Sequence, residues 1–173
     1  MRHVHAFGDD ALGHLDAVGL IEALNAGRVG RAEVVEAAIA RTEAVNPALN
    51  GVAYEAFDRA RAQAAAPARA GFFSGVPTFI KDNVDVAGLP TMRGTDAWPP
   101  RPAEADSDFA RMYLATGMTS LGKTQMSEYG FSPTSPLQDA GIRIEPPPSL
   151  AWAIGTAPAA TNAPEPDDDA PAV

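Results

Sequence analysis

The chain has 173 residues, of which 46% are hydrophobic, so it is long enough and apolar enough to form a core of its own. Its formal net charge of −9 argues against nucleic acid as a partner, and the lack of cysteine excludes disulfides and a thiolate nucleophile. No apolar run reaches the roughly 18 residues of a membrane span, and the start lacks the apolar stretch of a signal peptide. We therefore expect a cytoplasmic protein.

Two helices are expected in the first third of the chain. Apolar residues at helical spacing predict a helix over Asp16–Ala26, which Asp16 can cap and which Gly27 can follow in a left-handed turn. The same spacing predicts a second helix over Arg31–Val45. We expect Pro47 to end it, because the residue before a proline avoids the helical region.

Strands and helices alternate in the next part of the chain. Strands are predicted over Asn50–Tyr54, Val76–Ile80 and Met118–Leu121. An alanine-rich helix ends at Ala66, and a fourth helix follows Asp106 and ends at Gly117. Four residues of that last helix fall on one face: Phe109, Met112, Tyr113 and Thr116. The alternation indicates an α/β fold, with N-terminal helices and part of a mixed sheet covered by helices.

The composition changes near Pro136. Residues 137–173 contain seven prolines and no lysine, and their acidic residues outnumber the basic ones six to one. Such a segment buries too little apolar surface to offset the entropy lost on ordering. We therefore divide the chain into an N-terminal segment (1–15), a folded domain (16–136) and a Pro/Asp-rich tail (137–173) that is either disordered or out of frame.

One pattern suggests a nucleotide site. Gly117–Thr124 fits G-x-x-x-x-G-K-[ST], in which backbone amides and Lys123 would hold phosphate. A nucleotide-binding loop follows a strand and opens a helix, whereas here a predicted helix precedes the segment and its inner residues favour a strand. The competing interpretation is a turn at Gly117 and then a strand with Lys123 at its end. A P-loop-like nucleotide binder stays open as an alternative function.

Other candidate sites involve histidine or lysine. His3, His5 and His14 could chelate a metal, but they lie in a terminal segment without fixed geometry, so we expect no metal site. A Ser-His-Asp triad is disfavoured, because the chain has no Gly-x-Ser-x-Gly turn. A serine nucleophile would need another base, and lysine is a known substitute. Lys81 could serve if a pocket desolvated it at its strand end; the alternative is a solvated surface lysine.

The stretch Gly75-Val-Pro-Thr-Phe-Ile-Lys-Asp-Asn83 resembles the lysine motif of the amidase signature family. Thr91-Met-Arg-Gly-Thr95 resembles the glycine loop that follows it, and Leu121-Gly-Lys-Thr-Gln-Met-Ser-Glu-Tyr-Gly-Phe-Ser132 is similar to a third family segment. The helices before these motifs, with Ala32-Glu-Val-Val-Glu-Ala37 and Asn46-Pro-Ala-Leu-Asn50, also look like the family's N-terminus. The motifs occur in the family's order and cover about residues 15 to 135.

The resemblance implies hydrolysis of a small amide substrate by a Ser–cis-Ser–Lys triad without a cofactor. Lys81 would be the catalytic lysine and would relay a proton through a serine held by a cis peptide. A second serine would attack the amide carbonyl, and the acyl-enzyme would then be hydrolysed. Lys123 would be the end of a core strand, and its fit to a phosphate loop a coincidence.

The family's Gly/Ser-rich stretch, which carries both serines, has no counterpart after Pro136. Downstream of Ser135 the only serine is Ser149. We expect a chain with the base and without the nucleophile, inactive alone, and we favour a frameshift or truncation as its origin. The alternatives are a short protein with a disordered tail and a non-catalytic module that pairs with a separately encoded remainder.

Overall fold

A computed structural model describes residues 2–97, 99–131 and 142–144. In chain order its elements are β1 (Arg2–Val4), α1 (Ala17–Asn25), α2 (Arg31–Leu49), β2 (Val52–Glu55), α3 (Phe57–Ala65), β3 (Pro77–Lys81), α4 (Asp108–Leu114), β4 (Thr119–Thr124), the 3-10 turn η1 (Glu128–Gly130) and β5 (Ile142–Ile144). Within these ranges, no helix combines the length and the apolar character needed to cross a bilayer.

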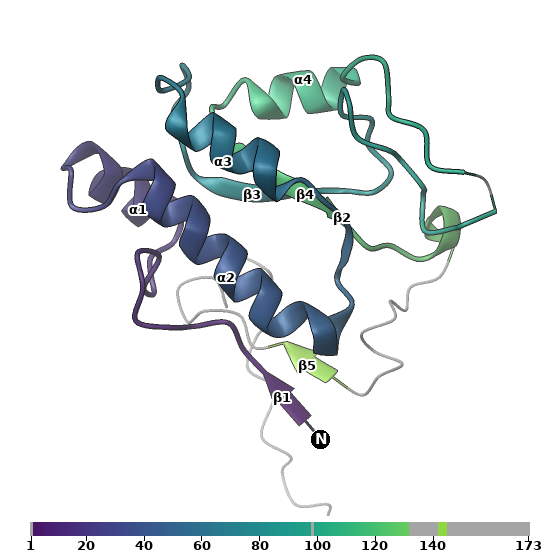
Figure 1. Ribbon diagram of the computed structural model, residues 1–173, viewed down its shortest axis with the longest axis horizontal. Helices are drawn as coiled ribbons and strands as arrows, with labels where there is room; N and C mark the ends of the chain where they lie inside the picture. The colour runs from purple at the N-terminus through teal and green to yellow at the C-terminus, as the bar shows by residue number, and fades with distance from the viewer. Residues whose placement is uncertain (1, 98, 132–141, 145–173) are drawn as a thin grey trace, which may run out of the picture.

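A three-stranded mixed sheet forms the centre of the fold. Its strand order is β2-β4-β3, with β2 antiparallel and β3 parallel to β4. Figure 1 shows these strands between α2 and α4. The connection from β3 to the parallel β4 passes through α4, as a crossover between parallel strands requires. The prediction of an α/β fold with a mixed sheet covered by helices is confirmed.

Two apolar clusters attach helices to this sheet. One joins Ile39 of α2 and Phe57 of α3 to Leu121 of β4. The other joins Ile80 of β3 to Ala110 of α4 and to Val86 in the segment after β3. Successive strand residues point to opposite faces, so Phe79 packs with the first cluster and Ile80 with the second. α2 and α3 therefore lie against one cluster, and α4 and the segment after β3 against the other.

The first helix has the predicted boundaries. The Asp16 side chain accepts a hydrogen bond from the Gly19 N–H at 2.8 Å, which caps α1, and Gly27 follows the helix with a φ of 66°. Upstream, Arg41 of α2 forms an ion pair with Asp10 at 2.6 Å and donates to the Gly13 carbonyl at 2.8 Å. This pair lowers the pKa of the Asp10 carboxyl through its hydrogen bond to Arg41. The segment before α1 is thus tied to α2.

The predicted end of the second helix was wrong. Pro47 lies inside α2, which continues to Leu49. A proline in the last turn removes one hydrogen bond, and the turn closes in other ways. Asn50 adopts the left-handed conformation with a φ of 48°, and the Asn46 side chain accepts from the N–H groups of Gly51 and Val52 at 2.9 and 3.1 Å. These bonds satisfy groups that the helix end would otherwise leave free.

The fourth helix is shorter than predicted and turned differently. α4 ends at Leu114, and its buried residue is Ala110 rather than one of the large apolar residues. Phe109 and Met112 are 59% and 70% exposed. Tyr113 packs inward, and its hydroxyl shares a hydrogen bond of 2.8 Å with the Thr78 hydroxyl of β3. Apolar spacing therefore identified the helix without identifying the face that meets the sheet.

A second, two-stranded sheet pairs the two ends of the described chain. Arg2–Val4 and Ile142–Ile144 run parallel, with His3 opposite Arg143, and they lie apart from the central sheet in Figure 1. Ile142–Ile144, which lies within the predicted tail, thus forms strand β5. The other residues of the predicted tail lie outside the described ranges, and the predicted division at 1–15, 16–136 and 137–173 stays a prediction.

The pairing of β2 with β4 requires a glycine, which gives a stability test. A Cβ built on Gly122, whose φ is 146°, would lie 2.0 Å from the Tyr54 carbonyl oxygen. Gly122→Ala should therefore lower the free energy of unfolding by at least about 2 kcal/mol, measured by urea denaturation. Gly51→Ala is the matched control, because its Cβ would meet nothing within 4 Å. Equal stability of the two variants would contradict this packing.

Candidate functional site

The site is built where β3 and β4 end together. Because the two strands are parallel, their C-terminal ends lie at the same sheet edge, with Lys81 opposite Thr124. Ligand sites in parallel sheets form at this edge, in the segments that follow the strands. Lys81 is the last residue of β3 and its side chain is exposed. Among the described residues its ammonium has no hydrogen-bond or ion-pair partner.

The neighbouring lysine is buried instead. Lys123 lies inside β4 with 0% of its side chain exposed, and its ammonium forms an ion pair of 3.3 Å with Asp82, which is 1% exposed. The ammonium also donates to the Pro90 carbonyl at 3.1 Å and to the Thr91 hydroxyl at 3.0 Å. Desolvation lowers the pKa of Lys123, and the Asp82 and Asp85 carboxylates oppose that shift. Lys81 is exposed, as in the solvated alternative, and the desolvated lysine of this edge is Lys123.

Asp82 joins the strand end to the loop that follows. Its carboxylate accepts from the Met92 N–H at 3.1 Å, and its carbonyl accepts from the Arg93 N–H at 3.0 Å. Its own N–H donates to the Thr124 carbonyl at 3.1 Å. Gly94 then passes so close to the next segment that a Cβ would lie 2.5 Å from the Met126 carbonyl oxygen. Asp82 is thus hydrogen-bonded both to the end of β4, at Thr124, and to the loop at Met92 and Arg93.

A hollow of about 490 Å³ opens at this edge. It is lined by Ala53, Asp82, Met92, Gly94, Thr95, Asp96, Gln125 and Glu128. These residues come from β2, from the segment after β3 and from the segment after β4. The lining contains three carboxylates and no basic residue, so the hollow is acidic. Lys81 is not among the lining residues, but Asp82, the residue that follows it, is.

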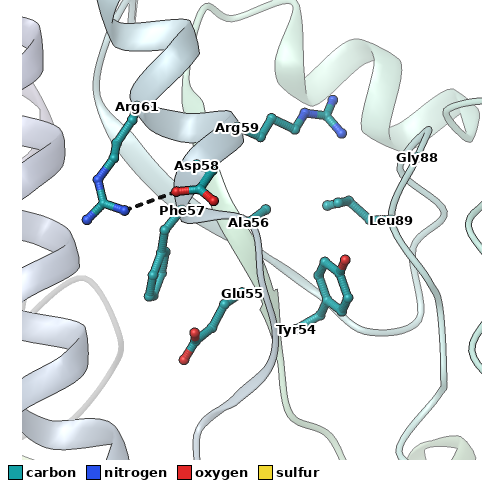
Figure 2. A pocket seen from close by; sticks show the side chains of 9 residues that line it. All are labelled: Tyr54, Glu55, Ala56, Phe57, Asp58, Arg59, Arg61, Gly88 and Leu89. Carbon is teal, nitrogen blue, oxygen red and sulfur yellow. Dashed lines mark hydrogen bonds and ion pairs between the residues drawn. The ribbon is translucent and has the colours of Figure 1, made fainter.

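A larger hollow of about 610 Å³ lies elsewhere and contains neither lysine. Figure 2 shows it between the start of α3 and the Gly88–Leu89 turn. Its cations already have partners: Arg59 donates to the Ala87 carbonyl at 2.7 Å, and Arg61 pairs with Glu36 and Asp58. We therefore place the candidate site at the edge that carries Lys81.

The structure contradicts a nucleotide-binding loop at Gly117–Thr124. Thr119–Thr124 is strand β4, and Lys123 is buried against Asp82 rather than free to meet phosphate. Gly122 is explained by its contact with β2. The interpretation of a turn followed by a core strand is confirmed, and the P-loop alternative is wrong.

The histidines offer no metal centre among the described residues. No group of three histidine, cysteine or acidic side chains with metal-binding geometry occurs in those ranges. His5 and His14 instead each stack with the Phe7 ring, with centroid distances of 6.2 and 5.4 Å.

The sequence interpretation missed the partnership of Lys123 with Asp82. A lysine inside a strand whose neighbours are buried needs a carboxylate, because an unpaired buried charge is costly. Asp82 lies two residues after the neighbouring predicted strand, so the two positions could have been paired once both strands were taken as parallel. The motif fit at Lys123 drew attention to phosphate instead.

The lowered pKa of Lys123 predicts how stability depends on pH. The folded chain releases this proton more readily than the unfolded chain, in which the ordinary value of about 10.5 applies. The cost of burying the charge therefore acts at neutral pH and is relieved as the pH rises through the lowered pKa toward 10.5. The urea midpoint of the wild type should rise over this alkaline range relative to Asp82→Asn/Lys123→Met, in which the pair is neutral. Parallel curves for the two proteins would contradict this.

The family model that matches this chain and two of its mycobacterial relatives are described as amidases. The family model described as Amidase matches residues 33–138. The chain is 72% identical over 132 residues to the protein named "Putative amidase AmiC" of Mycobacterium leprae, and 68% identical over 133 residues to its namesake in Mycobacterium tuberculosis (strain H37Rv). Both alignments cover 76% of this chain and 28% of the relative, so the chain spans little more than a quarter of these relatives' length.

Solved structures agree with these relatives. A 6-aminohexanoate cyclic dimer hydrolase superposes with a TM-score of 0.64 at 32% identity, covering 72% of this chain and 26% of that one. A bacterial aryl acylamidase of the amidase signature enzymes superposes with a TM-score of 0.58 at 30% identity, covering 68% of this chain and 26% of that one. The motifs around Lys81 and Lys123 lie inside the range that the family model matches. The chain therefore belongs to the amidase signature family.

Proposed function

We propose that this chain supplies the lysine-bearing part of an amide-hydrolysing site, with Lys81 as the catalytic base. The observation that carries the proposal is the place of Lys81. It ends a strand at the C-terminal edge of the parallel pair β3 and β4, and its ammonium has no partner among the described residues. Asp82, the next residue, lines a hollow at the same edge.

In this proposal a neutral Lys81 amine takes a proton from a serine hydroxyl, which in turn takes one from the nucleophilic serine. The nucleophile attacks the carbonyl carbon of a carboxylic acid amide, and backbone N–H groups hold the oxyanion. The amine leaves with a proton returned along the same relay. Water then hydrolyses the acyl-enzyme, giving the acid and the free serine. The two serines are those of the Gly/Ser-rich stretch that has no counterpart in this sequence.

The chemistry asks for a lysine that changes its protonation state during turnover. The ordinary lysine charge must be weakened by desolvation or by neighbouring cations before the amine becomes a base. In this chain Lys81 is exposed, so we propose that the segment carrying the serines also covers Lys81 and removes it from water.

A chimera tests the role of Lys81. Residues 1–131 of this chain replace the matching segment of the Mycobacterium leprae relative, whose 72% identity favours correct folding. Lys81→Met should lower kcat for hydrolysis of a simple amide by about 100-fold or more, the usual loss when a general base is removed. Arg69→Met, at an exposed cation that does not line the hollow, is the matched control. Full activity of the Lys81→Met chimera would contradict the proposal.

The 173-residue chain alone should release no ammonia from simple amides, because a base without a nucleophile has nothing to activate. The measurement is ammonia release by the purified chain, beside the unsubstituted chimera as a positive control. Turnover by the chain that disappears in Lys81→Ala would show that it carries a complete site.

A further inference from the structure

Lys123 is bonded to two parts of the segment that follows β3, its start at Asp82 and its later residues Pro90 and Thr91. Its ammonium touches the Asp82 carboxylate on one side and the Pro90 carbonyl and Thr91 hydroxyl on the other, at 3.0 to 3.3 Å. Asp82 is the residue directly after Lys81. Thr91 begins the loop that lines the hollow through Met92, Gly94 and Thr95. The buried Lys123 ammonium therefore joins the residue after β3 to the Pro90–Thr91 part of the loop.

The bonds around Asp82 extend this connection. Its carboxylate accepts from the Met92 N–H, and its carbonyl accepts from the Arg93 N–H. Without the Lys123 ammonium, this carboxylate would be a buried charge left with a main-chain donor alone. The loop would then move to let water reach it, because a buried unpaired charge is strongly disfavoured.

We propose that Lys123 is a positioning residue: by binding Asp82, Pro90 and Thr91 together, it fixes the strand end that presents Lys81 and the Thr91–Thr95 wall beside it. The inference rests on the proposed role of Lys81. A role in general stability alone would be met at lower desolvation cost by an apolar side chain in the same strand. The partners of Lys123 are instead oxygens from two parts of the segment after β3, which borders the hollow.

The charged groups that act on Lys123 belong to one segment of the chain. They are the carboxylates of Asp82 and Asp85, both in the segment after β3. The Pro90–Thr91 segment contributes a neutral carbonyl and a neutral hydroxyl, and β2 places Tyr54 opposite Lys123 in the strand register. Replacing the ammonium therefore leaves Asp82 without its cation, and the loosening should begin at the bonds that Asp82 accepts.

Backbone hydrogen exchange in the full chain, read residue by residue by NMR, tests the inference. In Lys123→Met the Met92 and Arg93 amides should exchange at least about tenfold faster, since a charge-assisted bond is lost. The backbone amide signals of Lys81 and Asp82 should shift. The amides of Val35 and Ile39 in the core of α2 should keep their wild-type rates. Equal acceleration in α2 would show a general loss of stability and overturn the inference, as would unchanged rates at Met92 and Arg93.

A milder matched pair covers the case in which Lys123→Met does not fold. Thr91→Val removes the hydroxyl and keeps the shape, whereas Thr91→Ser keeps the hydroxyl. Exchange at Met92 and Arg93 should accelerate a few-fold in Thr91→Val and return to the wild-type rate in Thr91→Ser. The same rates in both variants would overturn the inference. Neither measurement depends on turnover, so an active Lys81→Met chimera would overturn the proposed role of Lys81 separately from the geometry around Lys123.

Discussion

A lysine ammonium that loses contact with water needs oxygen partners, because desolvation disfavours its charge. In this chain three oxygens meet that need at Lys123, and each comes from a segment that must reach β4 to supply it. The segment after β3 folds back so that Asp82 and Thr91 face the same group. These three contacts of Lys123 hold the segment after β3 against β4 at the sheet edge, where Asp82 and Met92 line the hollow.

The rest of the fold supports that edge in a consistent way. α2 and α3 pack through Leu121 on one side of β4, and α4 packs through Ala110 against the strand that carries Lys81. Gly122 lets β2 approach β4 to a distance that no side chain would permit. β4 is therefore held on both flanks and on its face, so the buried lysine sits in the most firmly packed strand and the exposed lysine at the end of the adjacent one. The proposed division of roles between the two lysines, positioning for Lys123 and chemistry for Lys81, would follow from this strand order.

Local sequence patterns predicted the elements whose limits depend on interactions between residues close together in the chain. Asp16 and Gly27 marked the limits of α1, because capping and left-handed turns depend on neighbouring residues only. Pro47 misled, since its cost in the last helical turn is small and Asn46 and Asn50 close that turn. The face of α4 could not be predicted, because Phe109 and Met112 share a helical spacing whether or not they meet the sheet. Lys81 was proposed as the catalytic lysine from its motif, and that role stays a prediction. The Lys123–Asp82 pair depends on two strands lying parallel, which no single segment reveals.

The buried pair also constrains how such sequences can change over time. Losing Lys123 leaves a stranded carboxylate, and losing Asp82 leaves a stranded ammonium, so each single substitution is worse than the loss of both. Lineages that keep this strand edge must therefore inherit the two residues as a unit, or lose them in close succession through a poorly folded intermediate. We therefore expect Asp82 and Lys123, which are 41 positions apart in the chain, to be retained or replaced together.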